Sequence, residues 1–172
     1  MSEVAQTAVA PPATDTTWEI VPQGLLSRHF QLKRDGEVVS TLRMALFREQ
    51  CHFELAGHSF VIRRPSLWKD AFQLIAGSED GQSVCDVKRN FWSRQFVLAS
   101  AEQRWVLRPA GFFTRTQVLL VGTREVGSIR PAGWLARRRL AKFSEEMPPP
   151  IQVLAIFLVL IVSRRQNQSS GG

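Results

Sequence analysis

The chain has 172 residues and a net charge of +7, with 44% hydrophobic and 22% charged residues. This composition is typical of one globular domain and argues against a disordered, collagen-like or low-complexity chain. The two cysteines, Cys51 and Cys85, are too few for a disulfide scaffold and lack the spacing of a structural zinc site, so we expect a reducing compartment.

The two ends of the chain differ in composition from the middle. Residues 1–17 are small and polar and lack the basic and apolar regions of a secretion signal, so we expect a disordered N-terminal tail and a cytoplasmic protein. Residues 167–172 contain only Asn, Gln, Ser and Gly and predict a flexible C-terminal tail. Residues 18–166 are expected to form a single domain. Arginine outnumbers lysine 18 to 4, which suits a GC-rich bacterial genome.

Short apolar runs separated by turn residues begin at residues 18–21 and are typical of successive antiparallel strands. The strongest hairpin signal is Asp35-Gly36 between residues 30–34 and 37–46. Asp-Gly readily adopts the positive φ angles that a tight two-residue turn requires. A β-rich body is therefore predicted from the first runs onward.

A second hairpin is predicted at residues 51–56 and 59–63 around Gly57-His58, with Cys51 on its apolar face. The later strands are expected at residues 71–76, 83–88, 95–99, 104–108, 116–121 and 126–130. Close to a dozen short strands are predicted in all.

Two stretches of the chain repeat one another. Residues 60–65 and 72–77 correspond to residues 105–109 and 117–122, at a separation of 45 residues. Each copy is an apolar run that ends in Arg-Pro, followed by a longer run that ends in Gly, and proline ends a strand because it has no N–H to donate. A repeated multi-strand unit fits a barrel or a propeller, and two copies favour the barrel.

A nearly uninterrupted apolar run covers residues 151–162, after three prolines and before Arg164-Arg165. Prolines suit the first turn of a helix and cations its last, so we predict a helix near residues 148–166. Twelve residues at ~1.5 Å each cover roughly 18 Å, less than the ~30 Å core of a bilayer. A helix that is apolar all round must be enclosed, so we expect it inside a closed barrel. The residues expected to be buried there are Ile151, Leu154, Ile156, Phe157, Leu158, Leu160 and Ile161.

The opening hairpin around Asp35-Gly36, the repeated units at Phe60 and Trp105 and the apolar C-terminal helix together resemble the tubby C-terminal-like superfamily. This group includes LURP-one-related proteins and phospholipid scramblases. The resemblance covers about residues 18–166 and implies a mainly β fold, a closed antiparallel β-barrel of about twelve strands around a hydrophobic C-terminal helix. It implies binding and no catalysis, since tubby domains bind phosphoinositides through basic residues.

All of the net positive charge lies in residues 101–172, which hold 11 basic and 4 acidic side chains. Its densest cluster stands beside aromatic residues, a combination that suits an anionic phospholipid surface. A plain solvated face is the alternative. The candidate lipid-binding residues are Trp134, Arg137, Arg138, Arg139, Lys142 and Phe143.

No catalytic or phosphate-binding motif occurs in the sequence, so we expect a non-enzymatic protein with no cofactor. Cys51, His52 and His58 are the only cluster with the chemistry of a metal or nucleophile site. Adjacent strand residues point to opposite faces, so Cys51 and His52 are not expected to share a site, and no metal is predicted. The aromatic residues Trp92, Trp105, Phe112 and Phe113 are assigned to the barrel core and rim and not to a base-stacking platform.

Three other functions stay open. Residues 147–165 could anchor the protein in a bilayer, either as a tail anchor or as part of a scramblase-like protein, although the apolar run is short for this. The barrel could instead be a structural or protein-interaction domain. Nucleic acid is not expected as a partner, because the basic composition comes without a recognition helix or an RNP-like aromatic motif.

Overall fold

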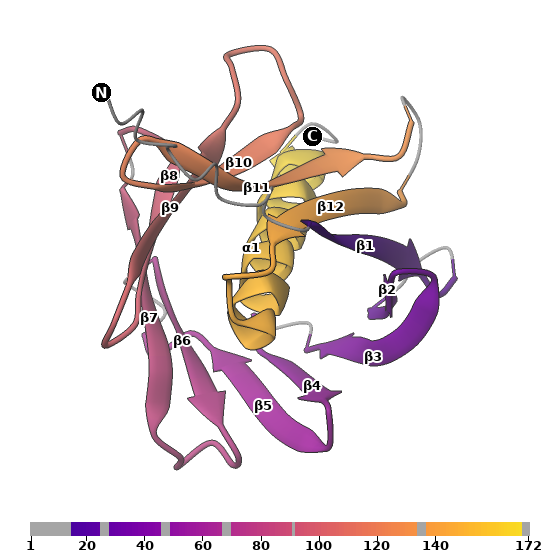
Figure 1. Ribbon diagram of the computed structural model, residues 1–172, viewed down its shortest axis with the longest axis vertical. Coiled ribbons are helices and arrows are strands. Elements are labelled where there is room, and N and C mark those ends of the chain that lie inside the picture. The colour runs from indigo at the N-terminus through magenta and orange to yellow at the C-terminus, as the bar shows by residue number, and fades with distance from the viewer. Residues whose placement is uncertain are drawn as a thin grey trace, which may run out of the picture.

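The computed structural model describes residues 15–24, 28–45, 49–66, 70–90, 92–133 and 137–169. They form a closed barrel of antiparallel strands with a single helix, α1, inside the ring (Figure 1). Each strand pairs with its neighbours in the sequence, and the last strand pairs with the first. The predicted fold class, a closed antiparallel barrel around a hydrophobic C-terminal helix, is confirmed.

The elements follow one another without a crossover. Their bounds are β1 Asp15–Pro22, β2 His29–Arg34, β3 Glu37–Met44, β4 Cys51–Leu55, β5 His58–Arg63, β6 Ala71–Ala76, β7 Ser83–Asn90, β8 Gln95–Ala99, β9 Arg104–Pro109, β10 Gln117–Val121, β11 Arg124–Pro131, β12 Arg139–Ser144 and α1 Pro149–Ser169.

The two predicted hairpins are present, with one shift. Asp35 and Gly36 have φ angles of 51° and 91°, which is the positive pair expected for a tight turn. In the second hairpin the turn is Ala56-Gly57, with φ angles of 50° and 77°, so His58 is the first residue of β5 and not a turn residue. The turn therefore lies one residue earlier than predicted.

The internal repeat corresponds to two equivalent pairs of strands in one barrel. The first copy forms β5 and β6, and the second forms β9 and β10. The glycines that follow β6 and β10, Gly77 and Gly122, both have positive φ angles, 81° and 59°. The repeat is therefore a structural one, with a left-handed glycine needed at the same point of each copy.

The strand that closes the barrel is one that the sequence interpretation missed. β12 pairs with β11 on one side and β1 on the other. Ala141 and Phe143 point inward and are buried, while Lys142 between them is exposed. Opposite Phe143 stands Gly127, where an added Cβ would lie 2.4 Å from the phenylalanine ring. β1 also begins at Asp15, three residues before the expected start of the domain.

The helix fills the barrel. Phe157 and Leu158 are fully buried, and Phe157 meets Phe72 of β6 edge to face at 5.7 Å between ring centroids. The one buried polar side chain of the apolar run, Gln152, accepts a 2.6 Å hydrogen bond from the Trp18 indole and donates to the Met147 carbonyl. The burial predicted for all seven helix residues is confirmed, at 0–6% exposure: Ile151, Leu154, Ile156, Phe157, Leu158, Leu160 and Ile161.

The barrel has two rims, because the connections between successive antiparallel neighbours alternate between its ends. Connections that follow the odd-numbered strands lie at one end, and those that follow the even-numbered strands lie at the other. α1 follows β12, so it begins at the even-numbered end, the entry rim, and runs back to the odd-numbered end, the exit rim.

Candidate functional site

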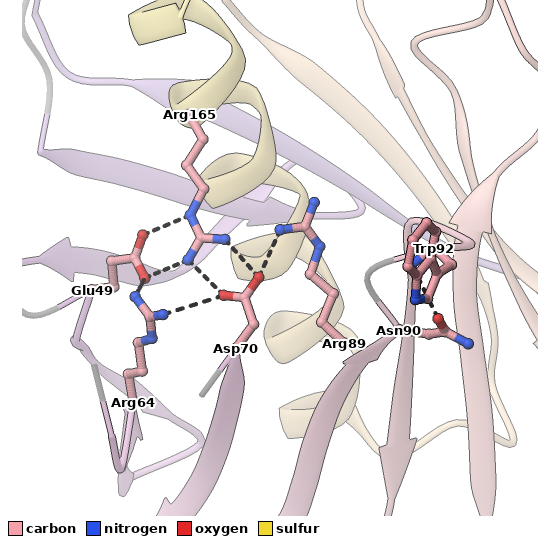
Figure 2. Close-up of polar contacts among 7 residues, drawn as sticks. All are labelled: Glu49, Arg64, Asp70, Arg89, Asn90, Trp92 and Arg165. Carbon is pink, nitrogen blue, oxygen red and sulfur yellow. Dashed lines mark hydrogen bonds and ion pairs between the residues drawn. The ribbon is translucent and has the colours of Figure 1, made fainter. Parts of the chain in front are cut away.

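An ionic cluster joins the end of α1 to the barrel wall at the exit rim (Figure 2). Arg165 of α1 binds Glu49 through two nearly parallel hydrogen bonds of 2.8 and 2.7 Å, and also reaches both carboxylate oxygens of Asp70 at 3.2 and 2.9 Å. Arg64 contacts Glu49 at 3.0 Å, and Arg89 contacts Asp70 at 2.7 Å. Three guanidinium groups thus contact two carboxylates. Glu49 lies in the β3–β4 connection and Asp70 in the β5–β6 connection.

The charges of this cluster stabilise one another. Burial by itself would raise the pKa of Asp70, but hydrogen bonds from Arg165 and Arg89 outweigh it and hold that pKa below its ordinary value. The hydrogen bonds that Arg165 donates to Glu49 raise the pKa of Arg165 further above its already high value, against the effect of burial. Bidentate arginine–carboxylate pairs of this kind are the strong ones among charged hydrogen bonds. The cluster therefore holds the end of α1 to the β3–β4 and β5–β6 connections.

Three aromatic side chains stand out from the same rim. Trp92, in the β7–β8 connection, is 95% exposed, and Phe112 and Phe113, in the β9–β10 connection, are fully exposed. These two connections belong to neighbouring hairpins, since β8 pairs with β9. Figure 2 draws Trp92 beyond the ionic cluster, where its backbone N–H is bonded to Asn90. We call Trp92, Phe112 and Phe113 the aromatic rim.

Exposed arginines flank the aromatic rim. Arg94 lies two residues after Trp92, and Arg108 and Arg115 stand on either side of the two phenylalanines; all three are exposed. Among the described residues, none of these three arginines is within 4.0 Å of a carboxylate. The exit rim therefore combines exposed aromatic area with exposed positive charge.

The basic patch predicted from the sequence is not one continuous surface. Phe143 is fully buried and cannot reach a membrane, because it faces inward with Ala141. Lys142 is exposed on the outer wall, between Thr17 and Ser128 in register, away from the rim. The assignment of Phe143 is therefore wrong, and Lys142 is separated from the other candidates.

The three arginines of that patch lie at the exit rim but have different surroundings. Arg137 is exposed, and Arg138 forms an ion pair with Glu19 of β1. Arg139, the first residue of β12, is only partly exposed and donates to Ser163 of α1 at 2.5 Å. Trp134 lies outside the described residues. The three arginines therefore do not act as one group.

The cysteine and histidine cluster has no catalytic arrangement. Cys51 is fully buried, and burial raises the pKa of its thiol to about 12. His52 is exposed and lies near Gln50 and Glu79 on the outer face. The predicted placement of Cys51 and His52 on opposite faces is confirmed. In the part of the chain that the structure describes, no group of three or more His, Cys, Asp or Glu residues could hold a metal ion.

A cavity of about 260 Å³ opens at the entry rim. Its walls include the buried Trp105 and Met147 and the exposed charges Arg124 and Glu146. These two charges pair with each other at 2.9 Å. The third charged residue of the wall, Glu102, is exposed and negative, so the cavity offers less to an anionic ligand than the exit rim does.

Sequence reasoning missed both features of the exit rim. Arg165 is 116 residues from Glu49 and 95 from Asp70, and no local pattern relates residues so far apart. The aromatic rim had a weak signal, since Phe112-Phe113 falls between two predicted strands and outside their alternation. The sequence interpretation assigned these aromatics to the core and rim together, so it did not separate exposed rim residues from buried core residues.

Comparison of the chain with protein-family models, with curated proteins and with solved structures finds no match. By hydropathy and length, one helix among the described residues passes as a candidate membrane span, at Pro149–Gln166, with 61% of that stretch buried in the barrel. The fold and rim together define an up-and-down β-barrel with a central helix and an aromatic, basic exit rim. Membership of the tubby-like superfamily stays a prediction.

Proposed function

We propose that this protein is a non-enzymatic, tubby-like or LURP-one-like barrel that associates with anionic phospholipid at a membrane surface. The observation that carries the proposal is the exposure of Trp92, Phe112 and Phe113 beside exposed arginines at one rim. Monomeric soluble proteins rarely present grouped large aromatics to water without an interaction that covers them. The exit rim is therefore the membrane-facing end in this proposal.

The chemistry of the rim suits the interface of a bilayer. Aromatic rings are favoured at the headgroup level, where an apolar body can be buried without crossing the membrane. Each arginine near an anionic surface contributes on the order of 1 kcal/mol, so Arg94, Arg108 and Arg115 together supply a salt-sensitive attraction. Binding at a membrane interface strengthens with the buried apolar area and with electrostatic attraction to anionic lipid, and the rim offers both.

The alternatives are less well supported. A tail anchor or a scramblase-like insertion would require α1 to leave the barrel, which would expose the core residues that now surround Phe157 and Leu158. It would also break the contacts of Arg165 with Glu49 and Asp70. A protein-interaction barrel shares the exposed aromatics, and the lipid-binding test below separates it from the proposal.

The test is flotation with vesicles of phosphatidylcholine, with and without phosphatidylserine. We expect the protein to float only with the anionic vesicles and to be released by salt. Replacing both Phe112 and Phe113 by serine should weaken binding about tenfold or more, because two aromatic rings no longer enter the interface. Val38→Ser is the matched control, since Val38 is an exposed apolar residue next to the β2–β3 turn at the entry rim.

Binding of the double variant as tight as that of the unaltered protein would rule out the aromatic rim as the contact. An absence of binding to any vesicle would reject the proposal and favour the protein-interaction barrel.

A further inference from the structure

The partly buried arginines of the exit rim differ in whether a carboxylate balances their charge. In the ionic cluster, Arg64, Arg89 and Arg165 face the carboxylates of Glu49 and Asp70. Arg139 has no such partner: among the described residues, no carboxylate lies within 4.0 Å of its guanidinium. A guanidinium held away from water without a negative partner is costly, and it is uncommon in proteins.

The hydrogen bonds of Arg139 do not make up for this. Its Nη2 donates to the Ser163 hydroxyl at 2.5 Å, and that hydroxyl donates in turn to the Val159 carbonyl at 2.8 Å. Its Nη1 is buried and has no hydrogen-bond partner in the part of the chain that the structure describes. The single contact is therefore to a neutral acceptor, and one donor nitrogen is left unused.

The surroundings of Arg139 are positive. Burial lowers the pKa of Arg139, and the charge of Arg115 in the β9–β10 connection lowers it further. The negative end of the α1 dipole gives little relief, because that effect is confined to the last turn and the helix runs on from Ser163 to Ser169. Strand register places both arginines at the exit rim on either side of β11: Arg139 pairs with Pro131, and Arg115 lies two residues before Gln117, which pairs with Ile129. Among the described residues, no carboxylate lies within 4.0 Å of either guanidinium.

We propose that Arg139 and Arg115 form a binding site for a phosphate group at the exit rim. Arg139 as a whole is partly exposed, and in the phosphate-bound state its side chain turns so that Nη1, which is now buried, donates to a phosphate oxygen. The guanidinium fork then matches the spacing of two phosphate oxygens. Arg115 is exposed, so it adds a second donor from the solvent side. In the ionic cluster, Glu49 and Asp70 supply the negative charge; at Arg139 and Arg115 a bound phosphate would supply it.

The phosphate has two possible sources, a lipid headgroup or a free phosphate compound. The site itself does not require the proposed membrane association, because its chemistry is complete without a bilayer. The headgroup source does rest on that proposal, since Phe112 and Phe113 of the aromatic rim precede Arg115 in the same connection.

The experiment is thermal unfolding of the full chain in inorganic phosphate and in chloride at equal ionic strength. We expect phosphate to raise the Tm with the logarithm of its concentration above Kd, by about 5 to 10 °C at a concentration roughly a hundred times Kd. Arg139→Met should abolish this rise while leaving the Tm in chloride unchanged or higher, because it removes an unmatched charge. Arg115→Met, in an exposed connection, should reduce the rise without disturbing the fold.

Arg124→Met is the matched control, because Arg124 is an exposed arginine at the entry rim, paired with Glu146. It should leave the phosphate effect intact. Equal Tm values in phosphate and chloride, or a phosphate effect that survives both Arg139→Met and Arg115→Met, would overturn the site.

Vesicle flotation of the same variants separates the two sources. If anionic vesicles bind the protein and Arg139→Met weakens that binding, the phosphate belongs to a lipid headgroup. If phosphate raises the Tm but no vesicle binds, the site takes a free phosphate and the proposed membrane association fails by itself. If vesicles bind and phosphate has no effect on the Tm, the membrane proposal stands and the phosphate site is rejected.

Discussion

The indole N–H of Trp18 donates a 2.6 Å hydrogen bond to the side-chain oxygen of Gln152, 134 residues further along the chain. Trp18 belongs to β1, and Gln152 lies in the first turns of α1, so the bond joins the wall of the barrel to its central helix. Both side chains are almost fully buried. Gln152 is thus the polar exception in the apolar helix because it satisfies two buried groups, the indole and the Met147 carbonyl.

Gln152→Leu is expected to lower the free energy of unfolding by about 1 to 3 kcal/mol, because it leaves a buried indole N–H without an acceptor. The measurement is urea unfolding followed by tryptophan fluorescence. Combining it with Trp18→Phe, which removes the donor, should give less than the sum of the two single effects. Additive effects would show that the two side chains are not energetically coupled.

Arg165→Met is expected to reduce stability by about 1 to 3 kcal/mol near pH 7, because it leaves Glu49 and Asp70 partly buried without their main partner. The pKa of Asp70 is lowered in the folded state, so its contribution is present above its ordinary value of about 3.8 and is lost as the pH falls through the folded value. The effect of Arg165→Met should therefore shrink as the pH falls below about 3.8. Arg124→Met, in an exposed pair, should change stability by less than about 1 kcal/mol.

Gly127→Ala is expected to destabilise the barrel by about 1 to 3 kcal/mol, because the new methyl group would meet the buried ring of Phe143 at 2.4 Å. Gly111→Ala is the control, since the nearest atom to its added Cβ is 3.6 Å away on Thr114. Denaturant midpoints measure both. Recovery of stability in the double variant with Phe143→Leu would identify the ring as the cause.

The thiols of Cys51 and Cys85 are expected to resist an aromatic disulfide reagent in the native protein. Both are buried, and burial raises the pKa of each to about 12, so almost no thiolate forms near pH 8. Both should react at once after unfolding in guanidinium chloride. An engineered Thr114→Cys in the exposed β9–β10 connection serves as the reactive control, and rapid labelling of the native thiols would contradict their burial.

Local patterns in the sequence were enough for most of the barrel. Asp35-Gly36 predicted a tight turn, alternation placed Cys51 inward, and the run at residues 151–162 predicted a helix that had to be enclosed. These features depend on neighbouring residues, whose conformational preferences and periodicity are local. The turn was predicted at Gly57-His58 and lies at Ala56-Gly57, one residue earlier. Both pairs contain Gly57, so the local sequence did not decide between them.

The sequence by itself determined that this protein builds a β-barrel around its own C-terminal helix. Only the tertiary structure decided that β12 closes the ring, which turned Phe143 from a surface candidate into a core residue. It also decided which arginines find carboxylates: Arg165 reaches Glu49 across 116 residues, while Arg139 faces Ser163. The reason is physical, because charge pairing and burial depend on which distant segments meet, and such meetings leave no trace in local composition.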